Sequence, residues 1–382
     1  MTRVDILHDR PVSPNMSAHD KSTVCDFPSL AALDDGRVMV IYRRGATKHS
    51  HDGVFVTQFT LDGGESWSEP KIMFDGREVE PNLAATTAGI CQAKDGALIC
   101  PFFVVEGLKP GVGMFDEVGF KLPRRIFVSL SHDAGDAWSP PEPYVYPDMP
   151  LSAITEKPFV LPNGEICIPI EYYNQDMVCR TALSFSSDNG RTFSRPPLHI
   201  ASDLTNQINY GDARFTLLPD GRLLMLLWTF LQANEETVEV HRSYSSDNGR
   251  TWTEPASIGF VGQVTNPLAL PAGGVVAVSN YRRPPEGIRL WYSPDGGATW
   301  DVNHPIQMWD ARECRMLGRP VAQSVAGPRG DGDEDIWASL TTFGFGTPDL
   351  VRLHDGTLLM SYYAEVDGII HVRACRFQFL AD

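Results

Sequence analysis

The sequence predicts an all-β protein, a six-bladed β-propeller of four-stranded antiparallel blades that residues 1–382 form as a single domain. Three observations support this prediction. The chain contains 33 Gly and 29 Pro, which favour many turns over long helices. A tight turn followed by an apolar run occurs six times, and a second motif follows five of these runs. Regular self-similarity of this kind is typical of repeat folds.

The first repeated feature is the tight turn. Each turn precedes an apolar run such as Val38–Tyr42 or Leu223–Trp228. Such dipeptides between β-type runs are a strong hairpin signal, because a two-residue turn requires positive φ. The six dipeptides are Asp35-Gly36, Asp95-Gly96, Asn163-Gly164, Asp220-Gly221, Gly273-Gly274 and Asp355-Gly356.

The second repeated feature is a box of the form Ser/Thr-x-Asp-x-Gly-x-x-aromatic. Its Asp is suited to accept hydrogen bonds from the backbone of its own turn, and its Gly permits a left-handed conformation. The aromatic ring is expected to pack into the blade beside it. We therefore interpret the box as a folding device. The five copies are Thr60–Trp67, Ser131–Trp138, Ser186–Phe193, Ser245–Trp252 and Ser293–Trp300.

Six turns and five boxes describe six units of roughly 55–70 residues, each a four-stranded blade. The sixth unit has no box and ends with two strand-like segments, Leu358–Ala364 and Ile369–Phe379. The N-terminal segment Arg3–His8 is expected to add the missing outer strand and close the ring. This closure removes exposed sheet edges.

Composition and net charge limit which kinds of molecule the protein is expected to bind. The net charge of −16 argues against nucleic acid or an anionic membrane, because such partners select for clustered Lys and Arg. Residues Met1–Asp20 contain no signal-like apolar run, and no stretch reaches the ~18 apolar residues of a membrane span, so a cytoplasmic location is expected. We expect a small-molecule or oligosaccharide substrate and no cofactor, and the sequence leaves a homo-oligomer open.

The seven cysteines are an odd number without a Cys-x-x-Cys pair. They indicate neither a disulfide framework nor a zinc site. The acidic run Asp331–Asp335 lacks the Gly and Glu of an EF-hand loop, and is interpreted as a solvated insertion. A second insertion, Gly111–Lys121, is expected at a rim or a dimer contact.

The boxes resemble the Asp-boxes, or BNR repeats, of the sialidase (neuraminidase) superfamily, and the resemblance covers nearly the whole chain. It implies an active site around the central channel, formed by the starts of the innermost strands and by the loops between second and third strands. Five copies at this spacing are specific for the fold. They say little about the reaction, because this fold supports several chemistries.

Compared with the sialidase pattern, this chain keeps some catalytic positions and lacks others. Asp52 matches the family's acid/base Asp, and Asp212 matches the Glu that supports the nucleophile. Asp26 stands where the family has an Arg that grips the substrate carboxylate, and Thr347 stands where it has the nucleophilic Tyr. The resemblance therefore implies a sialidase fold whose chemistry differs from that of a typical retaining sialidase.

The loop from Arg43 to Gly53 concentrates positive charge around Asp52 in an acidic protein. We interpret it as a substrate-binding loop at the channel mouth; the alternative is a solvated loop whose charges neutralise one another. No third ligand accompanies the two histidines, so a metal site is not expected. The potentially cationic side chains are Arg43, Arg44, Lys48, His49 and His51.

Further candidates come from strand ends that face the channel. Asp212 and Arg214, two apart on a strand, share a face, and form either a structural ion pair or a channel carboxylate oriented by a guanidinium. Glu171 and Tyr173 also share a face and are suited to acid/base work or to sugar hydroxyls. Equivalent strand ends in the fifth and sixth units supply two candidate substrate contacts. These are Arg282 and Tyr362.

Three functions fit these residues. The first is an exo-acting glycoside hydrolase on a terminal, non-sialic sugar, with Asp52 or His51 as proton donor and Asp212 or Asp26 as the opposite carboxylate. Glu171 is a further catalytic candidate. The second is a uronic-acid-specific lyase that uses His, Tyr and Arg side chains. The third is a carbohydrate-binding propeller without catalysis.

Overall fold

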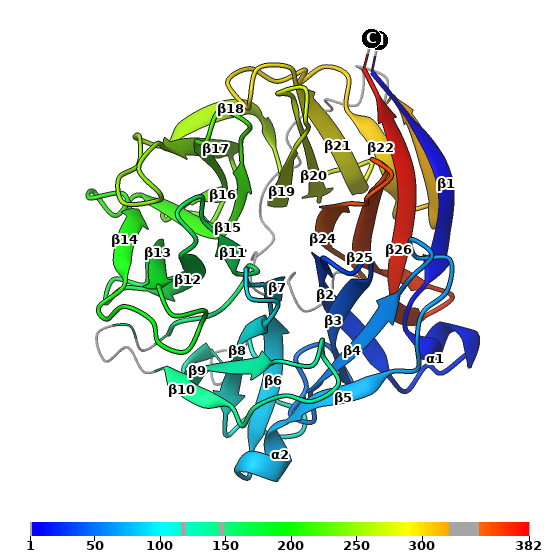
Figure 1. The fold of residues 1–382 in the computed structure, drawn as a ribbon, viewed down its shortest axis with the longest axis vertical. Coiled ribbons are helices and arrows are strands. Elements are labelled where there is room, and N and C mark those ends of the chain that lie inside the picture. The colour runs from blue at the N-terminus through cyan, green and yellow to red at the C-terminus, as the bar shows by residue number, and fades with distance from the viewer. Residues whose placement is uncertain (1, 116–119, 145–148, 150, 321–343, 382) are drawn as a thin grey trace.

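The computed structural model describes residues 2–115, 120–144, 149, 151–320 and 344–381. Six sheets surround a common axis as the blades of a propeller (Figure 1), which confirms the predicted fold class. We number the blades one to six by the position of their innermost strands along the chain. The innermost strands are β2, β6, β11, β15, β19 and β24.

The first three blades are formed as follows, from the axis outward. Blade one comprises β2 (Val24–Ala32), β3 (Val38–Gly45), β4 (Val54–Thr60) and β5 (Lys71–Asp75). Blade two comprises β6 (Leu83–Ala88), β8 (Leu98–Glu106), β9 (Arg124–Ser131) and β10 (Glu142–Tyr144), with the short β7 (Cys91–Gln92) also paired to β8. Blade three comprises β11 (Phe159–Val160), β12 (Ile166–Tyr173), β13 (Cys179–Ser186) and β14 (Leu198–Ala201).

The last three blades follow the same pattern. Blade four comprises β15 (Ile208–Leu217), β16 (Leu223–Leu231), β17 (Glu239–Ser245) and β18 (Ala256–Val261). Blade five comprises β19 (Gln263–Ala269), β20 (Val275–Tyr281), β21 (Gly287–Ser293), β22 (Ile306–Asp310) and an unpredicted fifth strand, β23 (Arg315–Pro320). Blade six comprises β24 (Phe345–Arg352), β25 (Leu358–Val366), β26 (Ile369–Leu380) and β1 (Arg3–Pro11).

Helices contribute little to the fold. Two single-turn helices, α1 (Pro14–Ser17) and α2 (Gly76–Val79), lie between blade strands. Within the described residues, no helix has the length and apolar character needed to cross a lipid bilayer.

The second strand of each blade is apolar along its length because neighbouring blades cover both of its faces. In β16, every residue from Leu223 to Phe230 is buried. In β20, Val275–Val278 are fully buried. Burial on both faces explains why these strands read as continuous apolar runs rather than as alternating ones.

The six predicted hairpin turns are present, with a different geometry from the one expected. In blade one, the Gly36 N–H donates to Leu33 O, and the Leu33 N–H donates to Arg37 O. The same pair of hydrogen bonds recurs in all six hairpins. Only the glycine has positive φ, for example 90° at Gly36, so each connection has three residues with glycine in the left-handed position.

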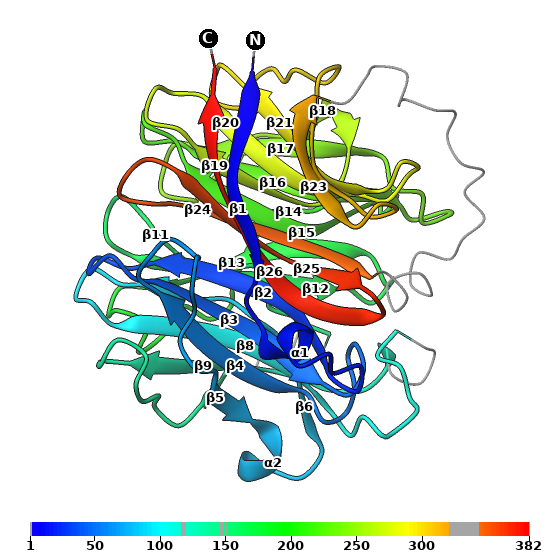
Figure 2. The same cartoon turned by 90° about the vertical axis from the view of Figure 1, so that its right-hand side faces the viewer.

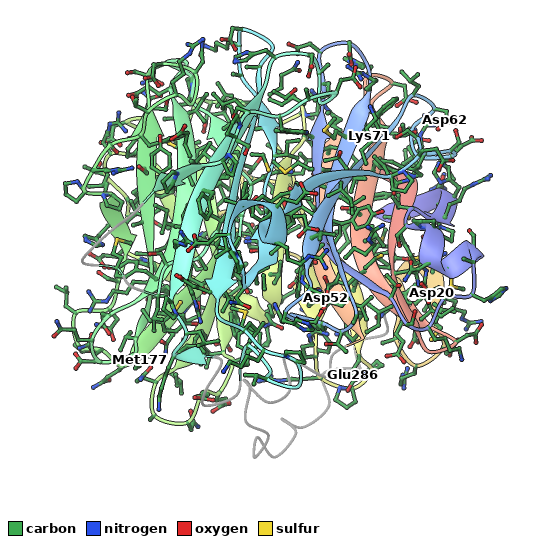
Figure 3. The ribbon with its side chains drawn as sticks, turned by 90° about the horizontal axis from the view of Figure 1, so that it is seen from below. Asp20, Asp52, Asp62, Lys71, Met177 and Glu286 are labelled. Atoms are coloured by element: carbon green, nitrogen blue, oxygen red, sulfur yellow. The ribbon has the colours of Figure 1, made fainter. Side chains whose placement is uncertain are left out.

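The boxes are built as the sequence predicts. In the fourth copy, Ser245 Oγ donates to Asp247 and accepts the Gly249 N–H, while the Thr251 N–H donates to the same carboxylate. In the first copy, partial burial would raise the pKa of Asp62, but hydrogen bonds from Ser66 outweigh it and hold that pKa far below its ordinary value. Figure 3 shows Asp62 toward the end of the propeller opposite Asp52, so this box lies away from the loops discussed below.

The N-terminal strand closes the ring as predicted. β1 pairs antiparallel with β26 from Arg3↔Leu380 to Pro11↔Arg373, and Figure 2 shows the two strands side by side with the termini together. The Asp9 carboxylate accepts hydrogen bonds from Arg373 Nη2 at 2.7 Å and from Tyr362 Oη at 3.1 Å. Tyr362 is therefore a buried structural residue that joins three strands of blade six, which corrects its assignment as a substrate contact.

Candidate functional site

A pocket with about 790 Å³ of empty space lies at the propeller axis. It opens toward the end that carries the loops between second and third strands. Figure 3 shows three such loop residues, Asp52, Met177 and Glu286, toward this end, and Lys71 toward the other. This axial pocket is the concave site that the propeller geometry predicts.

The first ring of pocket residues comes from five innermost strands and, in blade three, from the segment before β11. Each of its members precedes a turn glycine by nine positions and lines the pocket. Bulges in the inner strands turn four of these residues into the left-handed region, with φ of 43–53°. Such conformations are costly for residues such as Val264 and Thr347, and they cluster at functional sites. The six residues are Phe27, Thr87, Thr155, Asp212, Val264 and Thr347.

A second ring comes from the ends of the second strands. Each member follows a turn glycine by seven positions. Five of them pair with the inner strand at the edge of its bulge, whereas Glu171 forms an isolated bridge with Ala153. Five of the six line the pocket, namely Phe103, Glu171, Trp228, Asn280 and Tyr363. The sixth, Arg43, is fully buried beneath it.

The central chemical feature is a carboxylate pair from the two rings. The Asp212 N–H donates to Glu171 Oε2 at 2.7 Å. Burial raises the pKa of Glu171 to about 7, and the neighbouring Asp212 charge adds to the shift. Burial also raises the pKa of Asp212, although Arg214 and Arg282 oppose it. One member of the pair is therefore suited to hold a proton near neutral pH while the other is ionised.

The guanidinium of Arg214 lies beside the carboxylate pair. Arg214 Nη2 lies 3.7 Å from Asp212 Oδ1, and Arg214 Nε lies 2.9 Å from Glu156 Oε2. The bulge at Asp212 breaks simple strand alternation, yet the two side chains remain close. The guanidinium contacts the Asp212 carboxylate in the pocket, and its shorter, buried ion pair is with Glu156, a partner that the sequence interpretation did not name.

Two cations contact the hydroxyl of Tyr363. Lys48 Nζ donates to Tyr363 Oη at 2.9 Å, and Arg282 hydrogen-bonds the same residue. Arg282 Nε also donates to Gln263 Oε1 at 3.2 Å. A Cβ at Gly346 would lie 2.9 Å from Arg282 Nη2 and 3.0 Å from Tyr363 Oη, so a residue with a side chain would crowd this contact.

Aromatic side chains form much of the wall. The His49 ring packs at a tilt on Phe27 and edge-to-face on Phe115, with ring centroids 4.7 and 4.9 Å apart. Burial holds the pKa of His49 well below its ordinary value, so the imidazole is neutral in the folded protein. Tyr173 packs edge-to-face on Phe120 at 5.4 Å. The aromatic faces offer a surface on which the apolar side of a sugar ring can lie.

The insertion at Gly111–Lys121 contributes to the pocket, which differs from its expected place at a rim or dimer contact. Met114, Phe115 and Phe120 line the cavity beside Arg124, whose guanidinium lies over the Phe120 ring at 4.9 Å. The described part of this insertion therefore shapes the site.

Several polar atoms in the pocket wall have no hydrogen-bond partner among the described residues. They include Thr347 Oγ1, Asn280 Oδ1 and Arg124 Nη2. Buried polar atoms are normally paired, so unpaired ones that line a cavity are groups a ligand can satisfy.

The channel is crossed beneath the pocket by one buried network. Asp349 accepts from the backbone N–H groups of Leu30 and Leu350, both at 2.7 Å, and from Lys157 Nζ at 2.7 Å. Asn266 Nδ2 donates to the same carboxylate at 2.9 Å. These hydrogen bonds join blades one, five and six to the segment before β11, and they close the floor of the site.

Asp26 and Arg43 do not reach the pocket. Both side chains are fully buried, with Arg43 Nη1 3.5 Å from Asp26 Oδ1. Arg43 also donates to the carbonyl oxygens of Ala85, Thr47 and Ser50. Asp26 and Arg43 are thus structural residues that anchor the β3–β4 loop, rather than catalytic or substrate-binding ones.

The remaining residues of this loop divide in two. His49 and Lys48 line the pocket, whereas Asp52, His51 and Arg44 do not. The Asp52 carboxylate accepts the Ala46 N–H at 3.1 Å and closes the loop on itself. The geometry therefore does not bring Asp52 to the carboxylate pair.

Four pocket residues that the sequence interpretation missed share one sequence signal, a fixed distance from a turn glycine. Trp228, Asn280, Tyr363 and Phe103 would have been found by counting seven positions from each turn glycine. The sequence interpretation chose candidates by their place at the ends of the predicted strands, and it named Tyr362 instead of Tyr363. A one-residue error of this kind moves a side chain to the opposite face of the strand.

No group of three or more His, Cys, Asp or Glu side chains among the described residues is arranged to hold a metal ion. The acidic run Asp331–Asp335 lies outside the described residues.

Buried Asp26 gives a prediction about stability. Burial raises its pKa to about 6 although Arg43 opposes the shift, so the folded state binds this proton more tightly than the unfolded state. The contribution of Asp26 to stability therefore falls as pH rises from about 4 to about 6. Asp26→Asn is expected to match wild type at pH 4 and to exceed it at pH 8 by up to about 3 kcal/mol in denaturant unfolding. A less stable variant at pH 8 would show instead that the ion pair outweighs burial.

A family model described as a BNR repeat-like domain matches residues 111–360. This match spans well over half of the chain. The chain belongs to the BNR repeat-like domain family. With its fold, this places the protein in the sialidase superfamily, as the boxes had implied. A comparison with curated proteins finds no match.

Solved structures share the architecture of this BNR repeat-like protein. A protein of unknown function from Dyadobacter fermentans DSM 18053 aligns with a TM-score of 0.73 at 19% identity, over 99% of each chain. The Hadza microbial sialidase Hz136 aligns at 0.67 and 16% identity, over 93% of this chain and 65% of that one. The intramolecular trans-sialidase from Ruminococcus gnavus aligns at 0.65 and 12% identity, over 94% and 95%. At these identities the likeness establishes the fold alone.

Proposed function

We propose that the protein is an exo-acting glycoside hydrolase in which Glu171 is the general acid and Asp212 the general base or nucleophile. The observation that supports this is the carboxylate pair in the axial pocket, with a pKa of about 7 at Glu171. Glycoside hydrolysis requires one protonated and one ionised carboxyl group beside the scissile bond. Cleavage transfers the Glu171 proton to the leaving oxygen, and water supplies the hydroxyl of the new reducing end.

The architecture of the pocket favours a chain end as substrate. The Asp349–Lys157 network closes the floor, so a sugar enters from one side only. Aromatic walls around Phe27 and Trp228 suit a sugar ring. Thr347 occupies the position of the sialidase nucleophile and Asp26 is buried, which supports a substrate other than an ordinary sialoside.

The experiment that tests this function is a screen of fluorogenic glycosides. Hydrolysis of at least one terminal glycoside is expected, and Asp212→Asn should lower its kcat by about a hundredfold or more. Glu165→Gln, which alters a surface carboxylate paired with Arg250, serves as the control and should leave kcat unchanged. Ligand binding without turnover of any glycoside, or full activity in Asp212→Asn, would contradict the proposal.

A specific observation favours a second candidate, a lyase acting on uronic acids. Tyr363 Oη accepts from Lys48 and contacts Arg282, and these two cations are placed to bind the carboxylate of a uronic-acid substrate beside the tyrosine hydroxyl. Elimination produces an unsaturated sugar that absorbs near-ultraviolet light, whereas hydrolysis does not. Appearance of this absorbance with a uronate-terminated oligosaccharide would select the lyase.

A further inference from the structure

Arg214 lies between two carboxylates from different blades, that of Glu156, which is buried, and that of Asp212, which is partly exposed. Its Nε is 2.9 Å from Glu156 Oε2, and its Nη2 is 3.7 Å from Asp212 Oδ1. The Arg214 and Glu156 side chains are only 6% and 5% exposed. Glu156 has no part in the function proposed above, although a buried charge of this kind is costly unless it is paired.

The members of the carboxylate pair face different partners. Asp212 is close to the charge of Arg214, whereas Glu171 Oε2 accepts a neutral backbone N–H at 2.7 Å. A nearby cation stabilises the ionised form of a carboxyl group more strongly than a neutral donor does. The asymmetry therefore favours negative charge on Asp212 and a proton on Glu171.

We propose that Arg214, anchored by Glu156, determines which member of the pair carries the proton, by keeping Asp212 ionised. Glu156 is then a positioning residue. Its ion pair with Nε holds the guanidinium 3.7 Å from Asp212 instead of allowing a closed bidentate pair, so Asp212 remains available to substrate. The catalytic meaning of this inference rests on the proposed function, but the ionisation itself does not.

Other charged groups face these residues, and they do not reverse the asymmetry. Arg282, next to β20, acts on Asp212 and so favours the same ionised form. Arg124 from β9 and, after it, Arg214 itself act on Glu171 in the opposite sense, but both are secondary to burial and to the Asp212 charge. Burial raises the pKa of Glu156 to about 7; Arg214 and Lys157 oppose this shift, whereas Asp349 adds to it. Cys179 and Tyr173 beside Glu171 are neutral, because burial raises the pKa of both well above their ordinary values.

The test uses a double variant, Arg214→Met with Glu156→Gln. Removing Arg214 alone would leave Glu156 buried and unpaired and could unfold the chain, whereas the double variant removes both charges together. Carboxyl groups of ¹³C-Asp- and ¹³C-Glu-labelled protein are titrated by NMR, with Asp212→Asn and Glu171→Gln used to assign the two signals. In wild type, Asp212 is expected to ionise at lower pH than Glu171. In the double variant, the Asp212 midpoint should rise by about one pH unit or more.

A matched pair on the surface supplies the control. Arg250 Nη2 lies 2.7 Å from Glu165 Oε2, with side chains 41% and 21% exposed, and Arg250→Met with Glu165→Gln should leave both midpoints unchanged. An unchanged Asp212 midpoint in the buried double variant, or a wild-type pair in which Glu171 ionises first, would overturn the inference. These titrations need no substrate. A failed glycoside screen would therefore refute the proposed function while leaving this inference standing.

Discussion

Glu171→Gln is expected to lower kcat on a glycoside with a poor leaving group by about 10²–10⁴-fold, because the reaction loses its proton donor. The substitution keeps the shape of the side chain and an oxygen that can accept the Asp212 N–H. In wild type, kcat/KM should fall as pH rises through about 7, the pKa that burial and Asp212 give Glu171. In the Glu171→Gln variant, kcat/KM should no longer fall as pH rises through this range.

Leaving-group dependence provides the sharper measurement. A glycoside whose leaving group is a strongly acidic phenol needs no proton donor, so the same variant should hydrolyse it at nearly the wild-type rate. Equal losses on both substrates would show that Glu171 does not act as the acid. Glu165→Gln is the control for the substitution itself, and an unchanged midpoint of thermal unfolding verifies that the variant is folded.

Asp349→Ala is expected to cause the largest loss of stability, about 3–5 kcal/mol, because it leaves the partly buried Lys157 ammonium and several buried donors without their acceptor. It also removes an acceptor that serves the Leu30 and Leu350 N–H groups and the Asn266 amide. These donors belong to several blades, so the whole ring should be affected. Chemical denaturation with both intrinsic fluorescence and circular dichroism measures the destabilisation.

A double variant and a surface pair make this prediction specific. Asp349→Asn with Lys157→Met removes both charges and should recover part of the lost stability. Asp136→Ala breaks the Lys71–Asp136 pair, which is equally short at 2.7 Å but 55% and 68% exposed, and should cost less than about 1 kcal/mol. Comparable destabilisation at both sites would contradict the central role of Asp349.

Local rules explain why the fold could be predicted from the sequence. A glycine with positive φ at each hairpin, such as Gly36, and a hydroxyl–Asp–Gly contact in each box, such as Ser245 with Asp247 and Gly249, depend only on residues a few positions apart. Closure by the N-terminal strand followed from the missing outer strand of the sixth unit. These features are encoded where they occur along the chain.

The candidate site was predicted only in part. Glu171, Asp212, Arg214, His49 and Tyr173 were chosen correctly as pocket residues because strand alternation and the loop position place them at the channel. The carboxylate assigned by resemblance, Asp52, closes its own loop instead, since its oxygens accept the nearby Ala46 N–H.

The sequence by itself determined the repeat, the turns, the boxes and hence the six blades, because these rest on interactions within one hairpin. Only the tertiary structure decided which side chains meet at the axis. Glu171 and Asp212 come from different blades, as do Lys48 and Tyr363, and inner-strand bulges such as the one at Asp212 turn side chains by an amount that no period of two describes. Interactions between residues distant along the chain depend on how the blades pack, and that packing gives the pocket its chemistry.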